Sequence, residues 1–556
     1  MKQKTYFMIG FLALCFLFSG CKSQTVRSQA TEEEGGERTK AFFVGDLALP
    51  TDLGNIEVMS VSLATNLAGT GSDPPESSWR TMLLREMASQ NVESPNKILA
   101  STSTSLVITK GELVPGVQKG DRFDIEVTLP SDSETSSLRG GFVLQSPMRE
   151  MYVMDRIREG DKKATCAGPI LVEPKTGTQR DKVTQRRGKI LGGGVSQIAR
   201  PIGLRIVSQA AKPDPYQTMR IESAVNRRFV ITTASGYKEK VAKAKDDKYL
   251  QLRVPPKYKN HLVRYLEVVR CVPLVETESQ RLERLATLQL RLLDSTTAKR
   301  AALELEAIGH PAVETLKSGL TSPDVSVRFY AAEALAYLDE SESAQVLGEM
   351  ARTEHAFRGS ALLALCALDD LYAYEELRNL MNAPTAETRY GAFWALRKMR
   401  PEDPLVKGEM LGDGTFYLCT IPTEGKPMLH VRKTERAEIV LFGAGQSFKA
   451  PLVIEGANSI VVRSQNDQEM SISRFVPNRP DQRRVVSMKV EEVIRALSDV
   501  GATYPDVIEV LQAAIEQNAL ETNFRIDALP AARREKLKDK SEESPPEETD
   551  SPTGKG

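Results

Sequence analysis

The sequence has little histidine, few aromatic residues and no excess of charge of either sign. Its 556 residues include 4 histidines, and none of them lies within five residues of another histidine or of a cysteine. Metal ligands normally cluster, so this spacing predicts no metal site. Lys+Arg and Asp+Glu both total 74, and a net charge of zero excludes the electrostatic basis of general nucleic-acid binding. No G-x-S-x-G elbow and no marked pair of carboxylates is present. We therefore predict no catalytic residues, no cofactor and no nucleic-acid partner.

Glycine-rich segments resemble phosphate-binding loops only superficially. The segment LATNLAGTGSDPP (63–75) contains Gly69 and Gly71, but Asp73 and two prolines follow where a P-loop requires Lys and a hydroxyl. Prolines also remove backbone donors. A dinucleotide-binding fingerprint requires a third glycine that opens a helix. LGGGVSQ (191–197) and LFGAGQS (441–447) fail in the same way. We therefore reject phosphate binding at each of these segments.

Three short patterns resemble the signatures of penicillin-binding enzymes. They are Ser235-Gly-Tyr-Lys238, Ser464-Gln-Asn466 and Lys175-Thr-Gly177. Their order along the chain is wrong, because Lys-Thr-Gly comes first instead of last. Ser235 also follows a predicted strand and does not begin a helix. The enzyme alternative, a wall-active serine acyltransferase, predicts an adduct of Ser235 with a β-lactam probe, and we expect none.

The first 20 residues have the pattern of an export signal. Lys2 and Lys4 precede an apolar run from Tyr6 to Phe18, which is too short to span a bilayer as a helix. Ser19 and Gly20 are small and precede Cys21. This order resembles a bacterial lipoprotein signal, apart from Phe18, where leucine is usual. We predict a signal peptide over 1–20 and lipidation of Cys21. The alternative is an ordinary secretory leader that is cleaved nearby.

The two ends of the mature chain contain almost nothing to bury. Residues 21–40 are polar and charged, and we predict a flexible tether there. Residues 531–556 change from basic to acidic with several prolines, which predicts a disordered tail. The remaining cysteines are far apart in the sequence, and either one disulfide or single buried thiols would be consistent with their spacing. They are Cys166, Cys271, Cys366 and Cys419.

Short apolar alternations between turn signals dominate residues 41–275. IEVMSVSLA, SLVIT, DRFDIEVTL and YLQLRV predict half-buried strands. Two helices are predicted between them, at 77–90 and 216–229. The first places Trp79, Met82, Leu83 and Met87 on one face, and the second places Met219, Ile221 and Val225 on one face. The fold class is therefore predicted to be α+β.

Residues 276–405 contain a helical repeat. Arg328, Arg358 and Arg389 are 30 or 31 residues apart, and alanines follow each arginine after three and six residues. Leucine follows after seven residues, at Leu335, Leu365 and Leu396. Small residues allow helices to approach closely and leucines fill the seam, so the pattern resembles short HEAT-like repeats. Residues 298–320 form a degenerate terminal copy. The alternative is a helical bundle whose periodicity is accidental.

Strands return after residue 406, followed by two helices. AEIVLF, PLVIEG and SIVVRS predict strands. A helix in 490–500 should end at Gly501, and the next should begin with Pro505 in its first turn. Val507, Ile508, Leu511 and Ile515 form its apolar stripe.

The basic stretch RDKVTQRRGK (180–189) allows two interpretations. It carries five positive groups and one negative group. It is either a solvated loop or a contact for an acidic partner or a cell-wall polymer.

Segments on both sides of the repeat resemble one family, the bacterial flagellar P-ring protein. The resemblance rests on several segments in family order: VGDLALPTDLGNIEVMSVSLATNLAGTGSD, SSLRGGFVLQSPM, CAGPILV, PDPYQTMRIESAVNRRF, YLQLRVPPKYKNHLVRYLEVV and VEEVIRALSDVGATYPDVIEVLQAAIEQNAL. It implies P-ring-like parts at 41–275 and 406–530, interrupted by the repeat at 276–405.

The resemblance implies a structural subunit without catalytic activity, in which the Gly69–Gly71 segment is a turn. Such subunits form a periplasmic ring around the flagellar rod and act with the outer-membrane ring. The repeat and the lipid anchor depart from the family pattern. Lys22, which is not Asp, favours an anchor in the outer membrane. The alternative function is an envelope lipoprotein whose repeat binds a protein partner, without a motor role.

Overall fold

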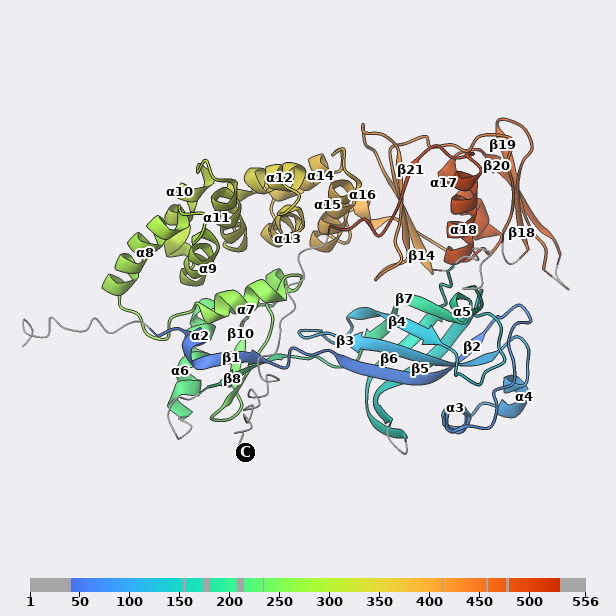
Figure 1. Cartoon of the computed structure of the whole chain (residues 1–556), viewed down its shortest axis with the longest axis horizontal. Helices are drawn as coiled ribbons and strands as arrows, with labels where there is room; N and C mark the ends of the chain where they lie inside the picture. Colours follow the sequence, from blue (N-terminus) through green and yellow to red (C-terminus); the bar gives the residue numbers. More distant parts are fainter. Residues whose placement is uncertain are drawn as a thin grey trace, which may run out of the picture.

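The structure is a computed structural model that describes residues 42–153, 157–173, 181–207, 215–233, 235–412, 414–456, 459–476 and 480–530. The predicted signal peptide, Cys21, the tether and the predicted tail at 531–556 lie outside these residues. Within the described ranges, no helix combines the length and apolar character needed to cross a membrane. Figure 1 shows a barrel lobe (56–200), a small lobe (42–51 and 202–275), the helical repeat (276–407) and a C-terminal lobe (409–530).

The barrel lobe is a closed barrel of antiparallel strands. In order around the barrel, the strands are β2 (Ile56–Thr65), β3 (Ser105–Leu113), β4 (Arg122–Thr128), β7 (Arg187–Ser196), β6 (Ile157–Pro169) and β5 (Phe142–Val153). Closure pairs the edges that an open sheet would expose. Side chains such as Val58, Ile125 and Met148 form its buried core. The predicted strands in 56–64, 105–109 and 121–129 are confirmed.

Two short helices cover one side of the barrel. They are α3 (Ser78–Ser89) and α4 (Pro95–Leu99). Another short helix of this lobe, α5 (Asp181–Thr184), lies just before β7. Leu83 and Met87 of α3 pack on Val61 and Leu63 of β2, with Trp79 and Met82 at the margin. This covering explains why the second half of β2 is buried on both faces and does not alternate. The predicted apolar face of α3 is confirmed.

The small lobe combines a four-stranded sheet with helices. The sheet order is β1 (Ala48–Thr51), β8 (Ile202–Ile206), β12 (Tyr249–Leu252) and β11 (Ala242–Ala244). The accompanying helices are α2 (Val44–Leu47), α6 (Pro215–Arg228), η1 (Pro256–Tyr258) and α7 (Leu262–Arg270). A separate hairpin consists of β9 (Val230–Thr232) and β10 (Lys238–Lys240). The prediction for α6 was wrong at Met219, which is 63% exposed, because Ile221, Ala224 and Val225 face the sheet instead.

The predicted repeat forms a row of antiparallel helices. They are α8 (Glu278–Leu292), α9 (Ala298–Ile308), η2 (His310–Ala312), α10 (Val313–Leu320), α11 (Val325–Tyr337), α12 (Ser343–Thr353), α13 (Arg358–Leu368), α14 (Leu371–Leu380), α15 (Ala386–Met399) and α16 (Pro404–Lys407). Leu335, Leu365 and Leu396 are fully buried, as are the alanines of both repeated columns. The columns read from the sequence therefore form the seam between stacked helices.

The repeated arginine ties each helix to the end of the one before it. Arg328 Nη1 donates to the Ser322 carbonyl at 2.9 Å, just after α10. Arg358 Nε donates to the Ala351 carbonyl in the last turn of α12 at 3.2 Å, and Arg389 Nε to Met381 just after α14 at 3.1 Å. A cation stabilises the negative end of a helix and satisfies a carbonyl that lacks an intrahelical partner. This contact accounts for the arginine column.

The C-terminal lobe places two helices between two sheets (Figure 1). One sheet has the order β13 (Glu409–Leu411), β14 (Phe416–Ile421), β16 (Glu438–Phe442), β15 (Met428–Val431) and β21 (Asn523–Ile526). The other has the order β17 (Val453–Glu455), β18 (Ile460–Ser464), β19 (Glu469–Arg474) and β20 (Gln482–Ser487). Helices α17 (Val490–Asp499) and α18 (Tyr504–Glu516) lie between them. The predicted stop at Gly501, where φ is +79°, and the start at Pro505 are confirmed.

The described cysteines are all single thiols. Cys166, Cys271, Cys366 and Cys419 are free and buried. Of the two alternatives left open by the sequence, the structure has single buried thiols. Burial raises the pKa of Cys271, Cys366 and Cys419 to about 11. These thiols therefore act as small apolar groups and are poor nucleophiles.

Candidate assembly surfaces

The Gly69–Gly71 segment is a turn that pairs with the chain beside it. The Gly71 N–H donates to the Thr102 carbonyl at 2.8 Å, so this donor is already used. A Cβ on Gly71 would lie 2.1 Å from the Thr104 carbonyl oxygen, which explains why glycine is required. Asp73 accepts from Arg80 Nη1 at 2.5 Å. The segment thus places a carboxylate where a phosphate would need a cation, and the prediction of a turn is confirmed.

The residues of the rejected acyltransferase pattern do not form one site. Ser235 lies in the turn of the β9–β10 hairpin, with its Oγ 3.0 Å from Thr233 Oγ1. Ser464 lies at the end of β18 in the C-terminal lobe, where its hydroxyl accepts from the Leu452 N–H at 2.9 Å. Lys175 lies outside the described residues. The two serines belong to different lobes and have no shared base.

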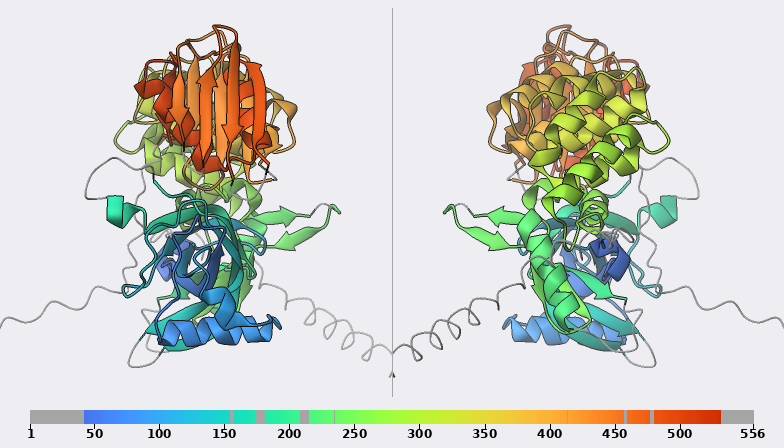
Figure 2. Two further views of the ribbon diagram at one scale, coloured as in Figure 1. Left: turned by 90° about the vertical axis from the view of Figure 1, so that its right-hand side faces the viewer. Right: turned by 90° about the vertical axis from the view of Figure 1, so that its left-hand side faces the viewer.

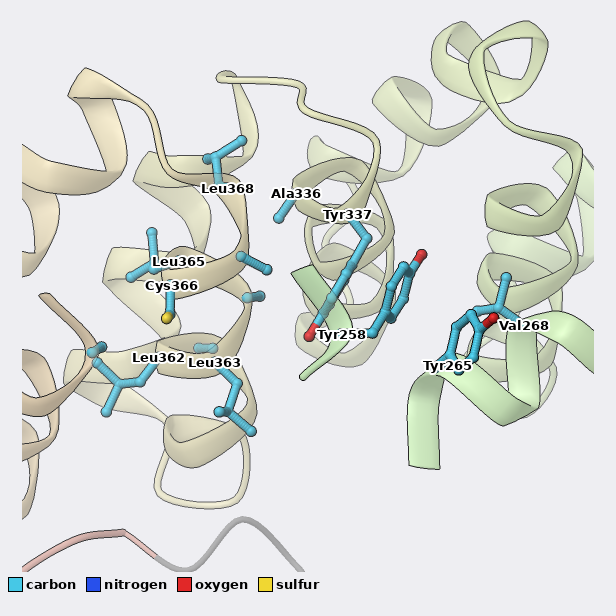
Figure 3. Close-up of a cluster of buried hydrophobic side chains, with 14 of the residues drawn as sticks. Tyr258, Tyr265, Val268, Ala336, Tyr337, Leu362, Leu363, Leu365, Cys366 and Leu368 are labelled. Carbon is cyan, nitrogen blue, oxygen red and sulfur yellow. The ribbon is translucent and has the colours of Figure 1, made fainter. Parts of the chain in front are cut away.

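A buried ion cluster joins the repeat to the small lobe. Arg264 of α7 inserts between Glu306 of α9 and Glu333 of α11, and the exposed fractions of the three side chains are 5%, 0% and 6%. Arg264 Nε donates to Glu306 Oε2 at 3.0 Å, and the Tyr258 hydroxyl donates to Glu306 Oε1 at 2.7 Å. Tyr258 also stacks on Tyr337 with ring centroids 4.8 Å apart (Figure 3). Small-lobe and repeat side chains thus share one core.

The pKa values of the groups in this joint are set by burial and by the neighbouring charges. Burial lowers the pKa of Arg264, but the adjacent Glu306 and Glu333 more than compensate and raise it above its ordinary value. Burial raises the pKa of Glu333, and Arg264 partly offsets that effect. Burial also raises the pKa of Tyr258 well above its usual range. The joint is therefore stable only with all three partners present, because a buried charge without a partner is costly.

A second buried cluster joins the repeat to the C-terminal lobe. Arg397 of α15 pairs with Glu438 of β16, and the Glu438 side chain is 0% exposed. The Tyr390 hydroxyl donates to Glu438 Oε1 at 2.6 Å. The Tyr390 ring stacks on His430 of β15 with centroids 3.5 Å apart. The core that begins in the small lobe continues through the repeat to Val440 and Phe442.

His430 is held in its neutral form. The Ala528 N–H donates to His430 Nε2 at 3.0 Å, so this nitrogen must lack a proton. Burial lowers the pKa of His430 to about 3, and the charges of Arg432 and Arg397 act in the same direction. The joint therefore depends on an uncharged imidazole.

The C-terminal lobe also contacts the barrel lobe directly. Asp124 of β4 accepts two backbone hydrogen bonds of 2.8 Å, from Gly192 of β7 and from Glu435. A Cβ on Gly192, whose φ is +58°, would lie 2.4 Å from the Glu435 carbonyl oxygen. Arg139 pairs with Glu509 of α18 nearby. The two halves of the sequence that flank the repeat are thus in contact.

A cavity of about 500 Å³ lies at this contact. The side chains that line it come from both lobes and include Thr128, Val172, Lys189, Lys433, Ile508 and Asp527. Part of the basic stretch 180–189 borders it, because Arg187 and Lys189 at the start of β7 line the cavity. Arg186 donates to the carbonyls of Thr135 at 3.1 Å and Ser133 at 2.9 Å. Arg186 therefore orders a neighbouring loop instead of extending into solvent.

Three surfaces present apolar groups to solvent. Figure 2 shows the β9–β10 hairpin extending away from the body, and it carries Tyr237, which is 74% exposed. Helix α8, the first of the repeat, exposes Leu282 and Leu290 by 64% and 76%. The outer face of the β17–β20 sheet has no helix on it in the same figure. A single exposed side chain such as Tyr237 is ordinary, whereas two on one helix are a candidate contact with another molecule.

Two regions of the chain are similar to known protein families. The model of the flagellar P-ring protein family matches residues 44–283, and the model of HEAT repeats matches residues 285–366. The flagellar P-ring protein of Thermotoga maritima is 25% identical over 233 residues, which are 41% of this chain and 65% of that protein. The P-ring protein of Pseudothermotoga lettingae is 24% identical over 220 residues, or 38% of this chain and 61% of the relative. That of Nitrosospira multiformis is 26% identical over 224 residues, or 38% and 55%.

The matches to P-ring proteins cover only part of this chain and part of each relative. The chain spans less than two thirds of the length of these curated relatives. The P-ring match contains the barrel lobe and the small lobe together with the start of α8. It ends before the C-terminal lobe, so the resemblance of residues 490–520 stays a prediction.

Proposed function

We propose that this protein, whose residues 44–283 match the model of the P-ring protein family, is an exported structural subunit of the flagellar basal-body P ring. Copies would assemble into a periplasmic ring around the rod, act with the outer-membrane ring, and support motility without catalysing a reaction. Lipidation of Cys21 would anchor the chain to the outer membrane. One observation carries the proposal: the family match at 44–283 spans the barrel lobe and nearly all of the small lobe.

The interlobe joints support a role in architecture. Arg264 and Arg397 bury charge at opposite ends of the repeat, and the flanking lobes also contact each other at Asp124. A body held at each of its joints keeps a constant shape, which a ring subunit requires. Ring closure uses two different patches of each copy that meet head to tail.

Deletion of the gene tests the ring function. We expect a strain without this protein to lack P-ring density in electron cryotomograms and to lose swimming, and the full chain to restore both. A C21S variant tests the anchor separately, because it removes the acylated thiol and leaves the described lobes unchanged. Normal rings and normal swimming in the deletion strain would contradict the proposal.

A second candidate function is binding of an envelope protein by the repeat, with no motor role. The observation that favours it is the exposed stripe of Leu282 and Leu290 on α8. An L282E/L290E variant should lose the partner in cross-linking experiments while swimming is unaffected. L371E is the matched control, since Leu371 is 61% exposed at the start of α14, away from α8.

A further inference from the structure

The outer sheet of the C-terminal lobe has two edges with opposite strand directions. Its four strands are all antiparallel to their neighbours, so β17 at one edge and β20 at the other run in opposite directions. Two copies placed side by side would therefore bring β20 of one against β17 of the next as an antiparallel pair. Strand β20 pairs with β19 over six residues without a bulge. Neither of the two edge strands, β17 and β20, contains proline. An edge without a bulge or a proline leaves its outward N–H and C=O groups available to a further strand.

The backbone groups at both edges point outward at defined residues. Gly456 N donates to Ile460 O, and Ser464 N donates to Leu452 O, so even-numbered residues of β17 face β18. By the alternation of an antiparallel ladder, Val453 and Glu455 direct their backbone groups to the free edge.

The same reasoning applies to β20. Gln465 N donates to Glu469 O and Phe475 N to Ser459 O, so even-numbered residues of β19 face β20. Their partners are Val486, Arg484 and Gln482. The backbone groups of Arg483 and Val485 therefore face the other free edge.

These outward residues lie at the same levels of the sheet. Val453, Arg463, Ser471 and Val485 form one straight row across the four strands. Glu455, Val461, Ser473 and Arg483 form the next row with outward-facing side chains. Continuing both rows into a second copy sets valine opposite valine and arginine opposite glutamate. Apolar pairs and opposite charges are the cross-strand pairs that stabilise antiparallel sheets.

We propose that β20 of one copy pairs with β17 of the next copy, with Val485 opposite Val453 and Arg483 opposite Glu455. The outer sheets of neighbouring subunits then form one continuous antiparallel sheet, and the contact is head to tail as a ring requires. Two long side chains now cap edge carbonyls, Gln517 on Val453 at 3.2 Å and Arg484 on Arg483 at 3.4 Å. Both side chains are exposed and would turn away on pairing. This inference rests on the proposed self-assembly.

Charge reversal of both edges tests the register. The full mature chain in detergent is followed by sedimentation velocity over a concentration series. We expect E455R alone and R483E alone to raise the concentration needed for assembly about tenfold or more, because each sets like charges opposite one another. An equal mixture of the two variants should recover assembly, since the E455R edge of one meets the R483E edge of the other. Recovery by mixing also shows that both variants are folded.

Control variants separate this edge from a general charge effect. R463E makes the same change on the same face in β18, away from the edge, and should assemble like the wild type. V485P removes an N–H that faces the free edge and no bond to β19, and should weaken assembly. Wild-type-like assembly by E455R and R483E, or no recovery on mixing, would overturn this interface alone. A wild-type chain that stays monomeric would overturn the ring proposal and this interface together.

Discussion

Acidification should weaken the joint between the repeat and the C-terminal lobe through His430. The ordinary histidine pKa is 6.5, and the folded protein lowers it to about 3. Above pH 6.5 both the folded and unfolded states hold a neutral ring, so no penalty arises. As the pH falls from 6.5 toward 3, the unfolded chain takes up a proton that the folded chain rejects, and stability decreases. One pKa unit corresponds to about 1.4 kcal/mol, so the loss at pH 5 is about 2 kcal/mol.

The measurement compares urea unfolding of the wild type and of H430F at pH 7.5 and pH 5. Phenylalanine keeps a ring against Tyr390 but cannot titrate, and the cost of the unpaired Ala528 N–H is the same at both pH values. A W79F background leaves Trp394 of α15 as the only tryptophan, so fluorescence reports this joint. Between pH 7.5 and pH 5, we expect the unfolding free energy of the wild type to fall by about 2 kcal/mol more than that of H430F.

His355 provides the control for this measurement, because its side chain is 84% exposed. In H355F, the unfolding free energy should fall between pH 7.5 and pH 5 by the same amount as in the wild type. Equal losses in the wild type and H430F would refute the reasoning, because they would show that His430 is not held neutral by the fold.

Three further substitutions test the core, a joint and the turn. L365A empties a fully buried seam position and should cost about 2–5 kcal/mol of unfolding free energy, whereas L371A on the surface should cost less than about 0.5 kcal/mol in the same denaturant titration. E438Q removes the buried partner of Arg397 and should cost roughly 3–5 kcal/mol; thermal melting of E438Q unchanged from wild type would exclude a structural ion pair. G71A forces a Cβ to 2.1 Å from a carbonyl oxygen and should lower the melting temperature, unlike G54A, whose Cβ would meet nothing within 4 Å.

The sequence predicted an element correctly where a single local requirement, such as close helix packing or a backbone preference, restricts the residue type. The alanine and leucine columns predicted the repeat because close helix packing tolerates few residue types at those positions. Gly501 and Pro505 predicted helix ends because each has a backbone preference of its own. Met219 was assigned wrongly because helical spacing alone does not say which of two adjacent faces meets the sheet. The position of the sheet decides that question.

The joints between lobes could not be predicted from the sequence. Glu306 and Glu333 lie within a helical pattern in which charged residues normally face solvent. Only the placement of α7 against α9 and α11 brings Arg264 between them. Similarly, the strands around Val453 were predicted, but their free edge is a property of the assembled lobe. The signal available in advance was limited to polar residues within otherwise apolar runs, such as ALELEAIG.

The repeat cannot be removed without altering the lobes that it joins. Deletion of 276–405 would remove the repeat partners of Arg264 and Glu438 and would expose the apolar core that the repeat shares with both lobes. Loss of rings after that deletion would therefore report a damaged fold as readily as a lost contact. L282E/L290E on α8 leaves both joints intact. A ring defect in that variant would show that the repeat contacts a neighbour directly, whereas normal rings would assign it the role of a strut between the two lobes.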